Sequence, residues 1–289
     1  MALEMPAALV ARARTLAQGG DWTPPPCRDA TTIVLLRDGA AGLQALLMRR
    51  PDTMAFAPGM HVFPGGSVDP VADSQPPVRG WMPDPGAGDP ELARALVVAG
   101  VRETFEEAGV LLAVDHAGRP ARPDDQWAAD RQASERASGF PAVLARRRLH
   151  ITGDLLVPIA HWITPEVETR RYDTRFLVAA LPEGQSVAAH TTETDSGHWM
   201  APGDALAAYR AGQMAMLPPT VAVLADLVGR RSVAAAMEWA RSRRQTVVPV
   251  MPRPRVAGEH LEWVLVHGYT GAVISATDQP AGSEERGIG

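Results

Sequence analysis

Short apolar runs bounded by turn residues characterise the region between residues 31 and 68. TTIVLLRDGAAGLQALLMRR, residues 31–50, holds two runs rich in Ile, Val and Leu on either side of a Gly-containing turn. Buried strands have this composition, so the segment predicts a β-hairpin. HVFPGGSV, residues 61–68, predicts a short strand interrupted by a proline and two glycines.

A helix is predicted between two strong boundary signals. Asp89 is a suitable N-cap and Pro90 suits the first helical position, where a missing N–H costs nothing. Gly109 suits the left-handed position that follows a helix. The sequence therefore predicts a helix from residue 90 to residue 108.

Along the whole chain the predicted elements run in the order strands, helix, strands and then helices. Helices are predicted within 115–136, at 140–150, near 204–211 and as a pair within 219–241; strands are predicted at 155–164, 174–181, 186–192 and 262–267. MPRPR, residues 251–255, is interpreted as a solvated segment. This order predicts a mixed-sheet α/β or α+β sandwich.

Changes in composition predict three regions. Residues 1–28 form an N-terminal arm, 29–230 the main domain, and 231–289 a C-terminal extension packed on that domain with a frayed tail. Residues 69–90 are dense in Pro, Gly and Asp and are expected to form a long surface insertion of the main domain.

The composition excludes several classes of protein. The formal net charge of the 289 residues is −5, and all 28 basic residues are arginine, so the chain lacks the basic excess of nucleic-acid binders. A single cysteine, Cys27, leaves no intramolecular disulfide. No window reaches the ~18 apolar residues of a membrane span, and residues 1–20 hold no apolar signal core. We expect a cytoplasmic protein that binds neither nucleic acid nor membranes.

Three glutamates stand within five residues of the predicted helix, in VRETFEEAGV, residues 101–110. Glu103 lies four positions before Glu107 and three before Glu106, so all three share one helical edge. Like charges at these spacings repel each other. A divalent cation such as Mg²⁺ or Mn²⁺, which prefers carboxylate oxygens, would remove the repulsion. The alternative from the residues alone is a solvated acidic edge.

With the glycines upstream, RETFEEAG (residues 102–109) resembles the box of the Nudix hydrolases. That box runs Gly, five residues, Glu, seven residues, then Arg-Glu-x-x-Glu-Glu-x-Gly. The resemblance implies a Nudix-type α/β/α sandwich around a mixed β-sheet, with extra helices here. It also implies that the three glutamates and a backbone carbonyl of Gly65 or Gly66, with Gly66 preferred, bind Mg²⁺ or Mn²⁺. The neighbouring cation of Arg102 is expected to orient a carboxylate.

The box departs from its usual form in two respects. Gly66 and Arg102 lie 36 positions apart where the usual box has 14, so some 22 residues are inserted between them. The expected glutamate is missing, because Ala72 stands six residues after Gly66 and Arg94 stands eight before Arg102. In the family this glutamate is mostly a structural tie, so its loss leaves the expected metal site in place.

The segment before the glycines is similar to the signature of coenzyme A diphosphatases within this family. The matching positions are Leu46, Leu47, Arg50, Gly59, Phe63, Pro64, Gly65 and Gly66. Three positions differ: Met48 replaces Thr, Pro51 replaces Ser or Ala, and Ala55 replaces a second Arg. Downstream, residues 161–182 and 193–206 resemble the peroxisomal branch, which also carries a long insertion in its box.

Recognition of coenzyme A would require several cationic groups, because its 3′-phosphate is separate from its diphosphate. The candidates for substrate binding are Arg50, Arg170, Arg171 and Arg175, together with the backbone at Gly65. The alternative is that the clustered arginines solvate one strand face. Tyr172 is interpreted as a strand-packing aromatic, with stacking on adenine as the alternative.

The implied reaction is attack of water on phosphorus beside a metal ion. Glu106, Glu107 and Glu193 are the candidates for the catalytic base, and Glu193 lies six residues before Trp199. Three histidines beside apolar runs are interpreted as structural, since a hard-cation site needs no imidazole: His61, His161 and His198.

The expected function is hydrolysis of the diphosphate of coenzyme A or acyl-coenzyme A, giving adenosine 3′,5′-bisphosphate and (acyl-)4′-phosphopantetheine. One alternative is hydrolysis of another nucleoside diphosphate derivative, such as NADH or ADP-ribose. A second alternative is a non-catalytic, nucleotide-binding regulatory module. The expected partner is a small nucleotide, with a homodimer left open.

Overall fold

The computed structural model describes residues 7–53, 57–76, 78–80, 88–136, 138–188, 196–243, 247–257 and 260–274. Its main feature is a mixed β-sheet with the strand order β11-β10-β7-β8-β1-β2-β3, in which β4 also pairs with β1 and β9 with β2. Its strands are β1 (Cys27–Gly39), β2 (Gly42–Arg49), β3 (His61–Val62), β4 (Gly65–Ser67), β7 (Val157–Ile163), β8 (Arg171–Ala180), β9 (Ser196–Met200), β10 (Pro249–Ala257) and β11 (His260–His267). β5 (Val78–Arg79) and β6 (Ile151–Thr152) pair separately.

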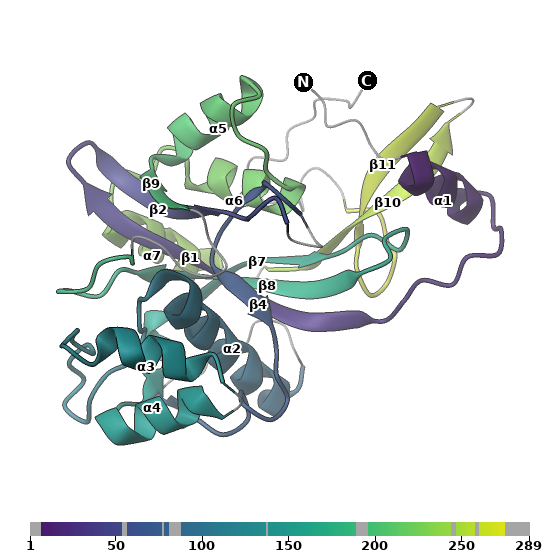
Figure 1. The fold of residues 1–289 in the computed structure, drawn as a ribbon. Coiled ribbons are helices and arrows are strands. Elements are labelled where there is room, and N and C mark those ends of the chain that lie inside the picture. Colours follow the sequence, from purple (N-terminus) through teal and green to yellow (C-terminus); the bar gives the residue numbers. More distant parts are fainter. Residues whose placement is uncertain are drawn as a thin grey trace.

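Helices cover both faces of this sheet (Figure 1). The helices are α1 (Ala7–Ala17), α2 (Pro90–Ala108), α3 (Trp127–Ser134), α4 (Gly139–Arg147), α5 (Pro202–Arg210), α6 (Pro218–Leu227) and α7 (Val233–Arg243), with a 3₁₀ turn at Gly153–Leu155. One face packs against α2, α3 and α4, and the other against α5, α6 and α7. This arrangement confirms the predicted α/β sandwich around a mixed sheet. No helix in the described part of the chain combines the length and apolarity that crossing a bilayer requires.

The predicted hairpin is confirmed as β1 and β2. Ile33 and Leu35 face α2, whereas Val34 and Leu36 face α6, and none of the four is exposed to solvent. Alternate residues of a strand point to opposite faces. An unbroken apolar run is therefore what a strand buried on both faces requires.

Both predicted boundaries of α2 are confirmed. The side chain of Asp89 accepts a hydrogen bond from the Glu91 amide, and Pro90 opens the helix. Gly109 adopts φ 71°, the left-handed conformation, and its amide donates to the carbonyl of Phe105. Because these signals act within a few residues, they place the helix without tertiary information.

The structure corrects two sequence predictions, one of them only in its described part. Residues 186–188 of the predicted strand 186–192 form no strand, and residues 189–192 lie outside the described part of the chain. MPRPR, interpreted as solvated, lies instead within β10. β10 pairs with β11 throughout but with β7 only at Pro249 and Val250. Beyond these two residues, the edge of β10 that faces β7 forms no backbone hydrogen bonds with that strand, so prolines without an N–H are tolerated there.

The insertion expected over residues 69–90 is only partly a surface loop. Ala72 and Asp73 are buried, and Val78 and Arg79 form β5 against β6. Residue 77 and residues 81–87 lie outside the described part of the chain. The start of the insertion is thus packed against the body of the protein.

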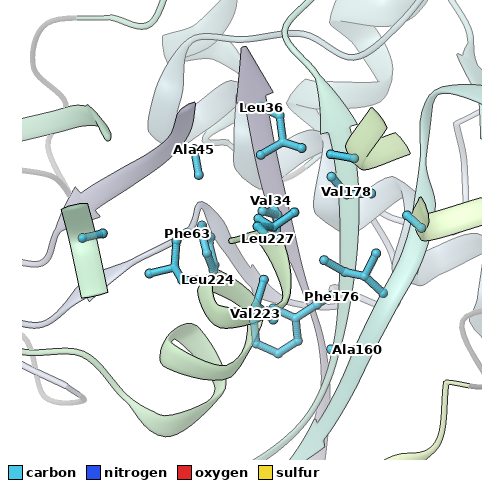
Figure 2. Close-up of a cluster of buried hydrophobic side chains, with 14 of the residues drawn as sticks. Val34, Leu36, Ala45, Phe63, Ala160, Phe176, Val178, Val223, Leu224 and Leu227 are labelled. Atoms are coloured by element: carbon cyan, nitrogen blue, oxygen red, sulfur yellow. The ribbon is translucent and has the colours of Figure 1, made fainter. Parts of the chain in front are cut away.

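Helix α6 packs into the hydrophobic core on the sheet face that α5, α6 and α7 cover. Val223, Leu224 and Leu227 point at the sheet and meet apolar side chains of β1 and β8, including Val34 and Val178 (Figure 2). Asp226 lies in the same helix and is only 5% exposed, and its Oδ1 has no hydrogen-bond partner among the described residues. Burial raises the pKa of Asp226 to about 7, although the charges of Arg243 and Arg230 oppose the shift.

We expect Asp226→Asn to stabilise the fold above neutral pH. The unfolded carboxyl loses its proton near pH 4 and the folded one near pH 7, so ionisation costs stability increasingly between these values. The variant should unfold with a free energy higher by on the order of 2 kcal/mol at pH 8 and nearly unchanged at pH 4. Urea titrations at both pH values, with the exposed Asp204→Asn as control, measure this. Equal stability at pH 8 would contradict it.

Candidate active site

Glu103 and Glu107 of α2 lie against the glycine-containing strand β4, and none of the three glutamates stands in bulk solvent. Glu107 is 8% exposed, and its Oε2 accepts a 2.9 Å hydrogen bond from the Gly65 amide. Glu103 lies directly over Gly66, where a Cβ would come within 2.4 Å of its carboxylate carbon. The side chain of Glu106 is 14% exposed. The acidic edge is therefore packed against backbone that only glycine allows to approach so closely.

Arg102 links this edge to the start of the insertion. Its Nε and Nη2 donate to the two carboxylate oxygens of Asp73 at 2.8 and 3.1 Å, and Nη2 also donates to the Ser67 carbonyl at 3.2 Å. Its Nη1 donates to Glu103 at 2.8 Å and to Glu106 at 3.1 Å. One guanidinium thus contacts three carboxylates in a partly buried setting, where such charge-assisted bonds are strong.

Burial and neighbouring charge act against each other at this cluster. Burial raises the pKa of Glu106 to about 7; the positive charge of Arg102 opposes the shift and the negative charge of Glu103 adds to it. Burial alone would lower the pKa of Arg102, but the hydrogen bonds to Asp73 and the charge of Glu103 hold it above its usual value. Arg102 therefore stays charged at neutral pH, whereas the Glu106 carboxyl titrates near pH 7.

The chemistry of these donors fits a hard divalent cation. Carboxylate oxygens are the ligands that Mg²⁺ and Mn²⁺ prefer. Glu106 Oε1 is buried with no hydrogen-bond partner among the described residues, and the absence of a Cβ at Gly66 lets the Glu103 carboxylate approach the backbone of β4. In the described part of the chain, no three His, Cys, Asp or Glu side chains are already gathered as a ligand set. Here the guanidinium of Arg102 balances the charge of Glu103 and Glu106.

The predicted substrate-binding arginines lie in different surroundings. Arg170 is exposed and Arg50 is half-buried at the end of β2. The guanidinium of Arg171 donates to the backbone carbonyls of Thr164 and Pro25, both at 3.1 Å. Their roles toward a substrate stay predictions, and Arg170 is the most accessible of the three.

Arg175 belongs to a buried ionic cluster. It is 2% exposed, and its Nη1 contacts Asp29 at 2.7 Å and the Asp173 carboxylate at 2.9 Å. His161 also bonds to the Asp173 carboxylate, whose other oxygen accepts from the Tyr269 hydroxyl at 2.9 Å. Burial lowers the pKa of His161, although Asp173 opposes the shift. Arg175 therefore ties strands together in this structure, and its predicted contact with substrate stays a prediction.

Two positions used in the sequence interpretation lie outside the described residues. These are Glu193, one of the three candidates for the general base, and Ala55, where the second Arg of the coenzyme A signature was expected. Of the candidates for the base, Glu106 and Glu107 are placed at the acidic edge. The identity of the base stays a prediction.

Sequence reasoning missed Asp73, the fully buried partner of Arg102. One signal could have found it. The box calls for an acidic residue six positions after the glycine, where Ala72 stands, and Asp73 follows immediately. A composition dense in Pro, Gly and Asp hid it, because surface loops share that composition.

Comparison with solved structures decides the family. A NUDIX hydrolase from Alicyclobacillus acidocaldarius is 30% identical, with a TM-score of 0.65, and the match covers 74% of this chain and 96% of that one. This chain belongs to the Nudix hydrolase family. Membership confirms, at the level of the family, the predicted class of hydrolases acting on phosphoric anhydrides.

Within the family, the similarity points to one group. Residues 88–227 match the model of the NUDT19 Nudix domain. Putative nudix hydrolase 7 of Caenorhabditis elegans is 26% identical over 219 residues, 75% of this chain and 66% of that protein. Human acyl-coenzyme A diphosphatase NUDT19 is 27% identical over 252 residues, 72% of this chain and 66% of that protein. The chain therefore spans just under two thirds of the length of these relatives.

Proposed function

We propose that this Nudix hydrolase cleaves the diphosphate of coenzyme A or acyl-coenzyme A, in a reaction that depends on Mg²⁺ or Mn²⁺. The products are adenosine 3′,5′-bisphosphate and (acyl-)4′-phosphopantetheine. The observation that carries the proposal is the buried acidic edge of α2 against β4. The similarity to NUDT19 acyl-coenzyme A diphosphatases supports the choice of substrate.

The residues of the acidic edge have distinct roles in this proposal. Glu103, Glu106 and Glu107, with the carbonyl of Gly66, would hold the divalent ion, as Nudix hydrolases generally use such ions. When bound, the ion polarises phosphoryl oxygens and makes a water molecule more acidic. Arg102 sets the direction of the Glu103 and Glu106 carboxylates through its Nη1.

The proposed chemistry is a single displacement. The oxygen of a water molecule bonds to one phosphorus, the anhydride P–O bond breaks, and the electron pair leaves with the second phosphate. A carboxylate takes the proton of the water. Glu106, Glu107 and Glu193 are the candidates for that carboxylate.

Recognition of the nucleotide is proposed to rest on accessible cationic groups. Arg170 is exposed, whereas Arg175 is enclosed by Asp29 and Asp173. Arg170 and Arg50 are therefore the first candidates for contact with the 3′-phosphate or the diphosphate, while the Gly65 backbone lines the acidic edge. A guanidinium suits a phosphate because it donates two parallel hydrogen bonds.

A substrate panel tests the proposal. Purified protein with Mn²⁺ is offered coenzyme A, acetyl-coenzyme A, dephospho-coenzyme A, NADH and ADP-ribose, and the products are identified by mass. We expect kcat/KM for coenzyme A and its acetyl ester to exceed that for NADH and ADP-ribose by at least about tenfold, the value of one well-placed charged contact. Dephospho-coenzyme A, which lacks only the 3′-phosphate, is the matched control for recognition of that group.

The panel also separates the alternatives. Cleavage of NADH or ADP-ribose alone would replace the coenzyme A assignment, an alternative favoured by Ala55 at a position where the signature has Arg. Nucleotide binding without cleavage of any compound would indicate a regulatory module. A cytoplasmic location and a homodimer stay predictions.

A further inference from the structure

The start of the insertion folds as a compact turn that delivers one carboxylate to α2. Asp69 Oδ1 accepts from the amides of Val71 and Ala72 at 2.8 and 2.9 Å. The turn closes when the Asp69 amide donates to Asp73 Oδ2 at 2.7 Å and the Asp73 amide donates to the Asp69 carbonyl at 2.9 Å. Asp73 is fully buried at its end. Such a network gives the Asp73 carboxylate little freedom.

Two arginines of α2 hold the start of the insertion in place, one at the turn and one just after it. Arg102 forms the forked pair with Asp73, and Arg94 Nη2 donates to the carbonyl of Pro76 at 2.7 Å. Arg94 occupies the position, eight residues before Arg102, where the usual box would have its glutamate. In this chain the helix thus presents a cation there, and the acid comes from the preceding segment.

The ion pair with Asp73 determines which N–H donors of Arg102 are available to the glutamates. Nε and Nη2 are occupied by Asp73 and the Ser67 carbonyl, so only Nη1 reaches Glu103 and Glu106. Without Asp73, two buried donor groups of the guanidinium would lack their partner, and unpaired buried donors are costly. The guanidinium would then turn toward the glutamates and compete with a cation for their oxygens.

We propose that Asp73 is a positioning residue for the metal-binding carboxylates, acting through Arg102 in place of the glutamate that the box lacks. This inference rests on the proposed function and assigns a role to a residue of the insertion. The carboxylate stands seven positions after Gly66, one later than usual. The box therefore continues through Asp73, and the additional residues enter after it.

The test measures Mn²⁺ affinity, without substrate, by the electron paramagnetic resonance signal of the free ion. We expect Asp73→Asn to weaken Mn²⁺ binding about tenfold, as loss of a group that orients metal ligands typically does. Asp73→Glu, which keeps the charge, should bind within about threefold of wild type because a carboxylate can still meet the guanidinium. The matched control is the exposed Asp125→Asn, which should bind as wild type does.

A second background shows whether the effect passes through Arg102. In an Arg102→Lys protein, which cannot form the forked pair, Asp73→Asn should weaken binding by less than about twofold, since coupled residues are not additive. An equal effect in both backgrounds would mean that Asp73 acts only through its charge and would overturn the proposal. Unchanged binding in Asp73→Asn would overturn it as well.

Folding of the variants and cleavage of the substrate panel are measured separately from Mn²⁺ binding. Cooperative thermal unfolding establishes that each variant is folded. If Asp73→Asn does not fold, Asp73→Glu provides the test. A loss of Mn²⁺ affinity of more than about tenfold in Asp73→Glu contradicts the proposed tolerance of a longer carboxylate. Wild-type protein that binds Mn²⁺ but cleaves no compound of the panel removes the proposed function and leaves this inference standing. Wild-type protein that binds no Mn²⁺ removes the inference.

Discussion

Glu107→Gln is expected to lower kcat for the diphosphate substrate by a factor on the order of 10³ or more, with an unchanged circular dichroism spectrum. The amide oxygen of Gln can still accept the hydrogen bond that Gly65 donates to Glu107. The substitution therefore keeps the link between α2 and β4 but removes a negative charge from the proposed metal site. Turnover and Mn²⁺ binding should fall together.

The control for this prediction lies on the same helix. Glu91 occupies the first turn of α2 and is exposed, so Glu91→Gln makes the same chemical change away from the acidic edge. It should leave kcat within about twofold, since surface changes of this kind have small effects. A near-normal rate in Glu107→Gln would remove Glu107 from the metal-binding residues.

Gly66→Ala is expected to lower kcat/KM about 100-fold, the loss that an ångström-scale misplacement of a catalytic group can cause. An added Cβ would lie 2.4 Å from both Cδ and Oε1 of Glu103. The Glu103 side chain would therefore have to move, which would also disturb its hydrogen bond with Arg102. Steady-state kinetics and Mn²⁺ binding measure the effect, and thermal unfolding should change little.

The neighbouring glycine should respond differently to the same substitution. A Cβ at Gly65 would meet backbone, 2.4 Å from the Thr31 carbonyl oxygen and 2.7 Å from the Thr32 Cα. Gly65→Ala should therefore cost about 2–3 kcal/mol of folding stability, because backbone cannot turn aside as a side chain can. Gly203→Ala, where a Cβ would meet nothing within 4 Å, is the control and should not lower the stability, since Ala is the better helix former in α5. Normal activity in Gly66→Ala would show that Glu103 is not held at the reacting centre.

Several elements were predictable because their signals are local. The bounds of α2 depend on Asp89 and Gly109, each of which acts on backbone groups within a few residues. The hairpin of β1 and β2 follows from apolar runs that only a two-sided burial explains. β10 was not predictable in this way, since its prolines are acceptable only because of which edges are paired.

The same division holds for the candidate site. Spacing alone placed Glu103, Glu106 and Glu107 on one edge of a helix, because helical periodicity is a property of the chain itself. Only the tertiary structure brought Asp73 to Arg102 across 29 positions and the Gly65 amide to Glu107 across 42. Contacts of that kind depend on how distant segments pack against each other, and a local sequence pattern does not specify that packing. The acidic edge was thus determined by sequence, and its partners by the fold.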